Sequence, residues 1–361
     1  MAQPSPTAPP IDSNVRHNIF FVACFCIHVN LQSVFLTTRG LTFLLLSLPF
    51  TPLVAGDVSS TVLRMERLPD GTRYALIGAC LPRDLLVEIA RGTLTRVWGN
   101  GKSEVIAELG GGPNGAALGP DGAVYVCNNG GFEWHDAGGF LFPGDRPPSY
   151  SGGRIERVDL KTGKWERLYE TCAGLKFNGP NDLVFDQHGG FYFTDLGKGY
   201  GRLHDRGAVY YATADGRSVK EIVFPIDQPN GCGLSPDEKA LYVAACQTGR
   251  LMKFDIVSPG ALAPGRGACV CGLPGMQLFD SLAIEADGRV CVATIKAGGG
   301  SITAIQADGA YEQMPFADPL VTNICFGDKD MQTAYVTLSA TGKLVSTAWK
   351  RPGLKLNFSG W

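Results

Sequence analysis

Five stretches of the chain repeat one pattern, and this repetition constrains the fold more than any other feature of the sequence. Each stretch opens with Asn or Asp, runs through a short apolar segment, reaches a turn residue seven positions later and continues as a β-rich run. The opening residues are Asn114, Asn181, Asn230, Asp280 and Asn323, spaced 43 to 67 residues apart. A repeat of this length built from short strands is typical of the blades of a β-propeller.

The residues seven positions after each opening are predicted to form turns. They are Asp121, His188, Asp237, Asp287 and Asp330. Asp is frequent in turns because its carboxylate accepts a hydrogen bond from a backbone N–H two residues later. We therefore assign the four aspartates to turns and give them no chemical role.

A sixth, degenerate repeat is expected before the first complete one. Aligning Val87-Glu88 with Val126-Cys127 puts its opening position near Ala75. The 47 glycines and the low charged fraction of 18% fit a domain with many tight turns and few solvated helices. Residues 57–361 are therefore predicted to form one all-β domain, a six-bladed β-propeller.

Residues 1–56 do not continue the repeat and are predicted to be a non-globular N-terminal extension. Residues 1–13 are rich in Pro, Ser and Ala, a composition typical of disorder. Residues 41–56 form a short apolar core after the basic Arg39, which resembles a secretory signal. The alternatives are a membrane anchor, or an extension outside the functional protein, which would leave the chain cytoplasmic. Membrane contact is expected only through this segment.

Composition excludes several classes of function. The formal net charge of −2 gives no electrostatic basis for binding nucleic acid. The five histidines form no HxH or HExxH motif, which argues against a zinc hydrolase built on histidine ligands. The 11 cysteines include no CxxC pair. Several lie in apolar strand runs and are expected to be reduced, buried and small: Cys127, Cys246, Cys271, Cys291 and Cys325.

The opening residues are candidate ligands of a hard cation. In a propeller the innermost strands line a central channel, and the residue that begins each strand lies near one mouth. Amide and carboxylate oxygens from Asn181, Asn230 and Asp280 would suit Ca²⁺, with Zn²⁺, Mn²⁺ or Mg²⁺ as alternatives. Ser281 could add a hydroxyl if a bulge turns it toward the same side as Asp280.

Two structural readings compete with this metal site. Asn-Gly pairs such as Asn114-Gly115 and Asn230-Gly231 are common turn formers. Buried polar side chains could instead satisfy one another in a ring of hydrogen bonds between blades. For Asn323 the structural reading is preferred, whereas for Asn181, Asn230 and Asp280 the metal reading is.

Residues 128–153 are a long insertion, rich in Gly, Pro and aromatic residues, that accounts for the widest repeat spacing. Long loops in compact domains usually carry function or are disordered. We expect this one to form a lid that selects the substrate.

The motifs GPNGAALGPDGAVYVCNNGGFEW, NGPNDLVFDQHGGFYFTD, QPNGCGLSPDEKALYVA and DSLAIEADGRVCVAT resemble the senescence marker protein/gluconolactonase/luciferin-regenerating enzyme family. The resemblance covers about residues 85–345. It implies a six-bladed propeller with a divalent cation, usually Ca²⁺, in the channel, and mostly lactone hydrolysis as activity.

The resemblance also implies roles for individual residues. Asn181 would contact metal or substrate, and Asn230 would be a metal ligand. Asp280 would be a metal ligand and the general base or nucleophile. Asn114 and residues of the insertion would lie nearer the substrate, a small lactone or ester: Asn128, Trp134 and His135.

One departure from the family pattern keeps rival functions open. The family carries a first-blade Glu as a second charged ligand, but the corresponding segment around Ala75, RYALIGAC, contains no carboxylate. Because cation affinity depends on ligand charge, a non-catalytic propeller that binds partners remains an alternative. A strictosidine-synthase-like condensing propeller is a third reading, but the late blades lack a well-placed Glu.

Overall fold

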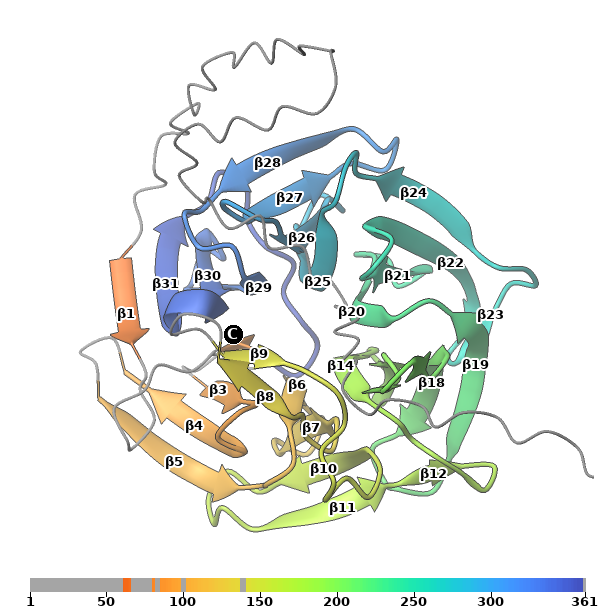
Figure 1. The fold of residues 1–361 in the computed structure, drawn as a ribbon. Coiled ribbons are helices and arrows are strands. Elements are labelled where there is room, and N and C mark those ends of the chain that lie inside the picture. Colours follow the sequence, from red (N-terminus) through yellow and green to blue (C-terminus); the bar gives the residue numbers. More distant parts are fainter. Residues whose placement is uncertain (1–60, 66–79, 82–84, 99–101, 137–140, 360–361) are drawn as a thin grey trace, which may run out of the picture. The chain divides into compact units, whose positions relative to one another are not determined.

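Six antiparallel sheets follow one another around a ring in the computed structural model (Figure 1). The structure describes residues 61–65, 80–81, 85–98, 102–136 and 141–359. The predicted all-β, six-bladed β-propeller is confirmed. The predicted extension 1–56 and the sixth opening position near Ala75 lie outside the described residues. Among the residues that the structure describes, none forms a helix with the length and apolar character needed to cross a bilayer.

The first three blades come from the N-terminal half of the ring. Blade 1 contains β2 (Cys80–Leu81), β3 (Leu85–Glu88), β4 (Thr93–Val97) and β5 (Ser103–Glu108). Blade 2 contains β6 (Pro113–Leu118), β7 (Val124–Asn128), β10 (Arg154–Val158) and β11 (Trp165–Tyr169). Blade 3 contains β14 (Pro180–Phe185), β15 (Gly190–Asp195), β18 (Gly207–Thr213) and β19 (Val219–Ile226).

The last three blades complete the ring. Blade 4 contains β20 (Pro229–Leu234), β21 (Ala240–Ala245), β22 (Arg250–Ser258) and β24 (Ala268–Gly272), with β23 (Ala261–Leu262) paired to β22. Blade 5 contains β25 (Leu278–Ile284), β26 (Val290–Ile295), β27 (Ser301–Ile305) and β28 (Tyr311–Pro315). Blade 6 contains β29 (Val321–Gly327), β30 (Thr333–Leu338), β31 (Lys343–Ala348) and β1 (Thr61–Met65).

Small elements lie in the connections between strands, most of them within a single blade. Three two-stranded hairpins lie outside the blade sheets. They are β8 (Trp134–Asp136) with β9 (Leu141–Pro143), β12 (Thr171–Cys172) with β13 (Leu175–Lys176), and β16 (Gly199–Tyr200) with β17 (Leu203–His204). One 3₁₀ helix, η1 (Ser339–Thr341), joins β30 to β31.

The ring closes by pairing its two ends. β1 runs antiparallel to β31 as the outermost strand of blade 6, with Thr61 opposite Ser346. The two strands lie at opposite ends of the described chain, so the repeat pattern gave no sign of this pairing. The segment Thr61–Met65, near the start of the predicted domain 57–361, thus completes blade 6.

Apolar side chains fill the space between every pair of neighbouring blades. The cluster between blades 2 and 3 is rich in aromatic rings, including Tyr125, Phe177 and Phe191. A smaller cluster of Leu86, Val97 and Leu344 joins blade 1 to blade 6. Blade-to-blade burial of this kind removes the apolar faces of all six sheets from water and holds the inner strands in fixed positions around the axis.

The predicted turns are confirmed for all four aspartates. The side-chain oxygens of Asp121, Asp237, Asp287 and Asp330 each accept a hydrogen bond from the backbone N–H two residues later. His188 does not play this part in blade 3. There Asp186, two residues earlier, accepts from the N–H groups of His188 and Gly190.

Candidate active site

Each complete inner strand loses regular pairing at its opening residue. The register shifts within five inner strands: between Pro113 and Ala116, Pro180 and Leu183, Pro229 and Cys232, Phe279 and Leu282, and Val321 and Asn323. Consecutive residues of a regular strand point to opposite faces, whereas a bulge re-aims a side chain. A bulge of this kind is what would let the side chains of Asp280 and Ser281 point to the same side.

Glycines explain how the openings of neighbouring blades come so close. A methyl group on Gly231 would lie 2.6 Å from the backbone nitrogen of Leu282 and 2.7 Å from Cα of Ser281. A methyl group on Gly115 would lie 2.3 Å from the carbonyl oxygen of Asn181. Both Asn-Gly pairs therefore lie inside strands β6 and β20, and the reading of them as turns is wrong. Their glycines are needed for close approach of backbones.

Two amide oxygens at the openings have no partner. The side chains of Asn181 and Asn230 are buried, 6% and 5% exposed, and neither Oδ1 atom accepts a hydrogen bond. A buried acceptor without a partner costs about 1–3 kcal/mol. Such atoms are rare in folded proteins and call for an explanation, one of which is an ion. The alternative reading, a ring of hydrogen bonds between blades, therefore does not satisfy these two oxygens.

Asp280, on β25, lies beside Asn230 in this buried setting. Burial raises the pKa of its carboxyl to about 7, the charge of Asp182 adds to the rise, and a hydrogen bond with the Asn230 side chain opposes it. Since that bond favours the ionised acid, the amide N–H of Asn230 is the donor. A 180° flip of the Asn230 side-chain amide exchanges its oxygen and nitrogen with little change in shape, and it would turn the oxygen toward Asp280.

Asp182, on β14, is a second carboxyl in this cluster that sequence reasoning missed. Burial raises its pKa to about 7, while hydrogen bonds from Ser281 and from the backbone N–H groups of Leu183 and Cys232 oppose the rise. It was overlooked because it holds no repeated position in the template. The sequence did contain a signal for it. In the PND motif Asp182 follows Asn181, and a bulge there would let both side chains reach the site.

The remaining opening residues are divided between two places. Asn114, at the start of β6, is buried beside blade 3, since Gly115 touches the Asn181-Asp182 backbone. Asn323 lines the cavity beside the C-terminal tail, which Asp182 also lines. Ser281 is buried and hydrogen-bonds Asp182, which places it between the two carboxyl groups of blades 3 and 5.

Asn128 is occupied within blade 2. Its Oδ1 accepts from the N–H groups of Gly112 and Gly130, and its Nδ2 donates to the Gly110 carbonyl and to Glu156. The side chain is fully buried. This amide braces the strand ends and offers no free group for a substrate, contrary to the role we had assigned it.

The insertion emerges on the same side of the ring as the candidate site. Asn128 pairs with Pro113, the residue before Asn114, so the chain leaves β7 at the mouth marked by the opening residues. Trp134 is half-buried and contacts the ring of Phe132, whereas His135 is exposed. Both predicted substrate contacts lie on the β8–β9 hairpin, which belongs to this insertion.

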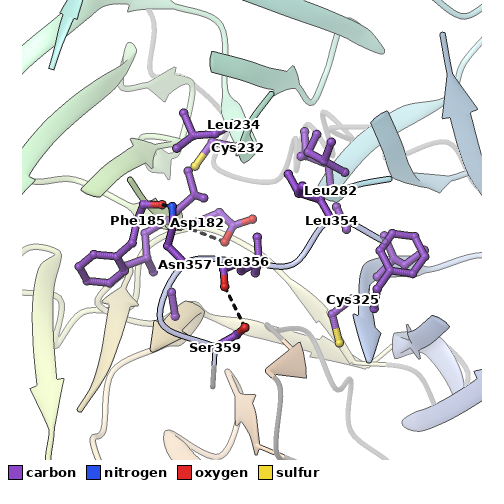
Figure 2. Close-up of a pocket in the computed structure, with 18 of the residues that line it drawn as sticks. Asp182, Phe185, Cys232, Leu234, Leu282, Cys325, Leu354, Leu356, Asn357 and Ser359 are labelled. Atoms are coloured by element: carbon purple, nitrogen blue, oxygen red, sulfur yellow. Dashed lines mark hydrogen bonds between the residues drawn. The ribbon is translucent and has the colours of Figure 1, made fainter. Parts of the chain in front are cut away.

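The C-terminal tail covers the other end of the channel (Figure 2). A cavity of about 90 Å³ lies there between the inner strands and the tail residues Leu354, Leu356, Asn357 and Ser359. The Asn357 amide donates to the Phe185 carbonyl and to Glu238.

The donor set fits a hard divalent cation. Asn181 and Asn230 supply unpartnered amide oxygens, and Asp280 and Asp182 supply carboxylates, the ligand types that Ca²⁺ takes. Across the described ranges, no three residues of the types His, Cys, Asp and Glu gather as a metal-binding group. Any cation here would depend on the amides as much as on the acids.

Sequence comparison places the chain among lactonase-like proteins. The profile of the SMP-30/Gluconolactonase/LRE-like region matches residues 83–340. A protein named lactonase Drp35 from Staphylococcus saprophyticus is 30% identical over 243 residues, 65% of this chain and 67% of that protein. Lactonase Drp35 from Staphylococcus haemolyticus is 32% identical over 184 residues, 50% of each chain. The chain thus matches between half and two thirds of the length of these curated relatives.

Solved structures share the fold. A gluconolactonase from Xanthomonas campestris superposes with a TM-score of 0.59 at 20% identity, covering 81% of this chain and 96% of that one. A luciferin-regenerating enzyme superposes with a TM-score of 0.60 at 18% identity, covering 82% and 99%. The family profile spans most of the described propeller, which confirms the resemblance seen in the motifs. The chain belongs to the SMP-30/gluconolactonase/LRE-like family.

Proposed function

We propose that the protein is a cation-dependent lactone hydrolase, with its active site at the mouth formed by Asn181, Asn230 and Asp280. The observation that carries the proposal is the pair of buried, unpartnered Oδ1 atoms of Asn181 and Asn230 beside two carboxyl groups. Relatives named lactonase and gluconolactonase support the reaction class.

A divalent cation, most simply Ca²⁺, would be held by Asn181, Asn230, Asp280 and Asp182 and would polarise the lactone carbonyl. Ser281, predicted as a ligand, is hydrogen-bonded to Asp182 and would orient that carboxylate. Asp182 would also compensate for the missing first-blade Glu, because it brings a second negative charge to the site. The main argument for a non-catalytic propeller is weakened accordingly.

Asp280 is the proposed general base. Burial raises the pKa of its carboxyl to about 7 when no cation is bound. A bound cation would favour the ionised form, so Asp280 would act as a carboxylate base on a water that the cation also polarises. Asp280 would take a proton from the attacking water as its oxygen bonds to the carbonyl carbon. When the ring C–O bond breaks, the same proton would pass to the leaving alkoxide, giving a hydroxy acid. Asn114, beside blade 3, and Trp134 on the insertion would contact the lactone.

The test measures acid release from a sugar δ-lactone and an aromatic δ-lactone by the purified full chain. Asp280→Asn should lower kcat by at least 10²-fold, the usual scale for loss of a general base. Asp308→Asn, at an exposed turn in blade 5, is the matched control and should leave kcat unchanged. Activity of Asp280→Asn equal to that of the wild type would refute the assignment. A folded wild type that binds a divalent cation but hydrolyses neither lactone would favour the binding-module alternative.

A further inference from the structure

Three buried side-chain atoms in the described part of the chain have no hydrogen-bond partner: Oδ1 of Asn181, Oδ1 of Asn230 and Nδ2 of Asn129. The first two are acceptors and belong to the proposed cation site. The third is a donor, and the proposed reaction has not used it. Since buried polar atoms are nearly always paired, an unpartnered donor calls for a ligand that brings an acceptor.

Asn129 lies at the mouth that the opening residues mark. It directly follows β7, and its backbone N–H donates to the carbonyl of Gly112 over 2.9 Å. Gly112 directly precedes the inner strand β6 and stands two residues before Asn114. A methyl group on Gly112 would lie 2.3 Å from Oδ1 of Asn129. The Asn129 amide therefore packs against the start of the inner strand of blade 2, on the side of the ring where the other two unpartnered atoms lie.

Two donors fix the orientation of this amide. Its Oδ1 accepts from the backbone N–H of Gly131 over 2.9 Å and from Nζ of Lys198 over 3.1 Å. A flipped amide would place its NH₂ group against the Gly131 N–H, which can only donate. Nδ2 is therefore the free end of a side chain that is 2% exposed and held from blades 2 and 3. A donor fixed in this way needs no reorganisation when an acceptor oxygen reaches it.

We infer that Nδ2 of Asn129 donates a hydrogen bond to the ring oxygen of the lactone, the oxygen that leaves as an alkoxide. The inference rests on the proposed function, since it concerns the same reaction. Two oxygens gain negative charge during lactone hydrolysis: the carbonyl oxygen as water adds, and the ring oxygen as the ring C–O bond breaks. The cation is proposed to polarise the carbonyl oxygen, which leaves the ring oxygen for the remaining donor at the mouth.

The hydrogen bond stabilises charge and transfers no proton from Asn129. The electron pair of the breaking C–O bond goes to the ring oxygen, and the proton that Asp280 took from water then passes to that oxygen. The benefit depends on the basicity of the leaving oxygen. An aryl lactone leaves as a phenoxide, whose conjugate acid has a pKa of about 10, whereas an alkyl lactone leaves as a much more basic alkoxide. The alkyl lactone should therefore depend more on Asn129.

Asn129→Asp is the sharpest variant, because it keeps an oxygen for Gly131 and Lys198 and turns only the free donor into an acceptor. With saturating divalent cation, it should lower kcat for δ-valerolactone by at least about 10²-fold, the usual effect of losing one such donor. For a benzo-fused δ-lactone with a phenoxide leaving group, the loss should stay below about tenfold. Gln306→Glu makes the same chemical change at an exposed amide after β27 and, as the matched control, should leave both values unchanged.

A second measurement leaves Asn129 intact, so it does not depend on that variant folding. Asp280→Asn is expected to be too slow to consume a bound lactone during crystal soaking. A crystal structure of this variant with δ-valerolactone should place the ring oxygen within about 3.2 Å of Nδ2 of Asn129. A bound lactone whose ring oxygen points away from Asn129 overturns the inference.

The outcomes separate this inference from the proposed function. Equal losses for the alkyl and aryl lactones in Asn129→Asp overturn the contact with the leaving oxygen and leave the lactone hydrolase intact, because a structural role or a contact with the carbonyl oxygen would affect both lactones alike. Unchanged kcat for δ-valerolactone in Asn129→Asp also overturns it. A wild type that hydrolyses neither lactone overturns the proposed function and this inference with it.

Discussion

The carboxyl of Asp182 lies close enough to that of Asp280 for its charge to raise the pKa of Asp280, although the two belong to blades 3 and 5. Both acids have a pKa of about 7, mainly because burial disfavours the charged form. Two buried acids without a counter-ion are costly when ionised, and a divalent cation would remove that cost.

The first prediction concerns pH and stability. Each acid has a folded-state pKa of about 7, raised from the model-peptide value of 3.8. Between these values the folded protein binds more protons than the unfolded chain. The free energy of unfolding should therefore fall as pH rises from about 4 to about 7, by up to about 1.4 kcal/mol per pH unit for each acid.

Urea unfolding with a chelator present, at several pH values, measures this slope. Asp280→Asn should flatten it, and saturating divalent cation should do the same by stabilising the ionised acids. Asp215→Asn, at an exposed turn, is the control and should keep the wild-type slope. A wild-type slope that Asp280→Asn leaves untouched would contradict the buried-acid description.

The second prediction tests the close approach of β20 to β25. Gly231→Ala places a methyl group against backbone atoms of Ser281 and Leu282, which cannot move as a side-chain tip can. Overpacking of this kind typically costs about 1–3 kcal/mol, and the shift should also misplace Asp280. We expect lower stability in urea and a reduced kcat in the folded fraction.

Gly272→Ala is the matched control for Gly231→Ala. A methyl group there would meet only the Arg250 side chain, at 3.5 Å, which is ordinary contact. Its stability and kcat should equal those of the wild type. Equal effects of the two substitutions would show that close packing at Gly231 does not position the site.

The third prediction concerns the anchor of the C-terminal tail. Glu285, on the loop after β25, is fully buried and accepts hydrogen bonds from the Trp349 indole and the Arg351 guanidinium. Arg351→Leu would leave the buried carboxylate with only the more distant Arg289, 4.0 Å away, at a cost of up to about 3–5 kcal/mol. Denaturant unfolding should show this loss. Arg217→Ala, which removes an exposed pair with Asp215, should cost under about 0.5 kcal/mol.

Sequence reasoning reached the blade count and the turns because both are local and repeated. The opening residues recur at one position in the template, and each turn aspartate bonds to its own backbone two residues on. Pairing of β1 with β31 lay beyond this reasoning, because the outermost strand of a blade can come from either end of the chain.

The site was harder to predict than the fold because bulges break the alternation on which strand reasoning rests. Asn181 and Asp280 were found from the template, whereas Asp182 was not considered because it holds no repeated position in that template. Asn128 was predicted to contact the substrate because it lies at the start of the insertion. Its side chain instead forms hydrogen bonds to the backbone within blade 2. Side-chain direction at irregular positions follows from packing that the template does not record.

The last prediction addresses the insertion through Lys198, which lies in the loop between β15 and β16. Its Nζ donates to Oδ1 of Asn129 over 3.1 Å and to the Gly131 carbonyl over 2.7 Å, and it lies 3.2 Å from the centre of the Phe132 ring. Lys198 is 1% exposed, and burial lowers the pKa of its ammonium group well below the usual value. A blade 3 side chain thus holds the root of the blade 2 insertion.

Lys198→Met keeps the length and apolar stem of this side chain but removes its hydrogen bonds. Loss of a buried charge offsets part of the lost bonding, so global stability should change by no more than about 1 kcal/mol. The insertion should loosen, which limited proteolysis within residues 129–153 would report. If the insertion selects the substrate, KM for a bulky lactone should rise several-fold while kcat stays within twofold. Lys161→Met, at an exposed turn of blade 2, should change neither cleavage nor KM, and a Lys198→Met variant indistinguishable from it would show that Lys198 does not hold the lid.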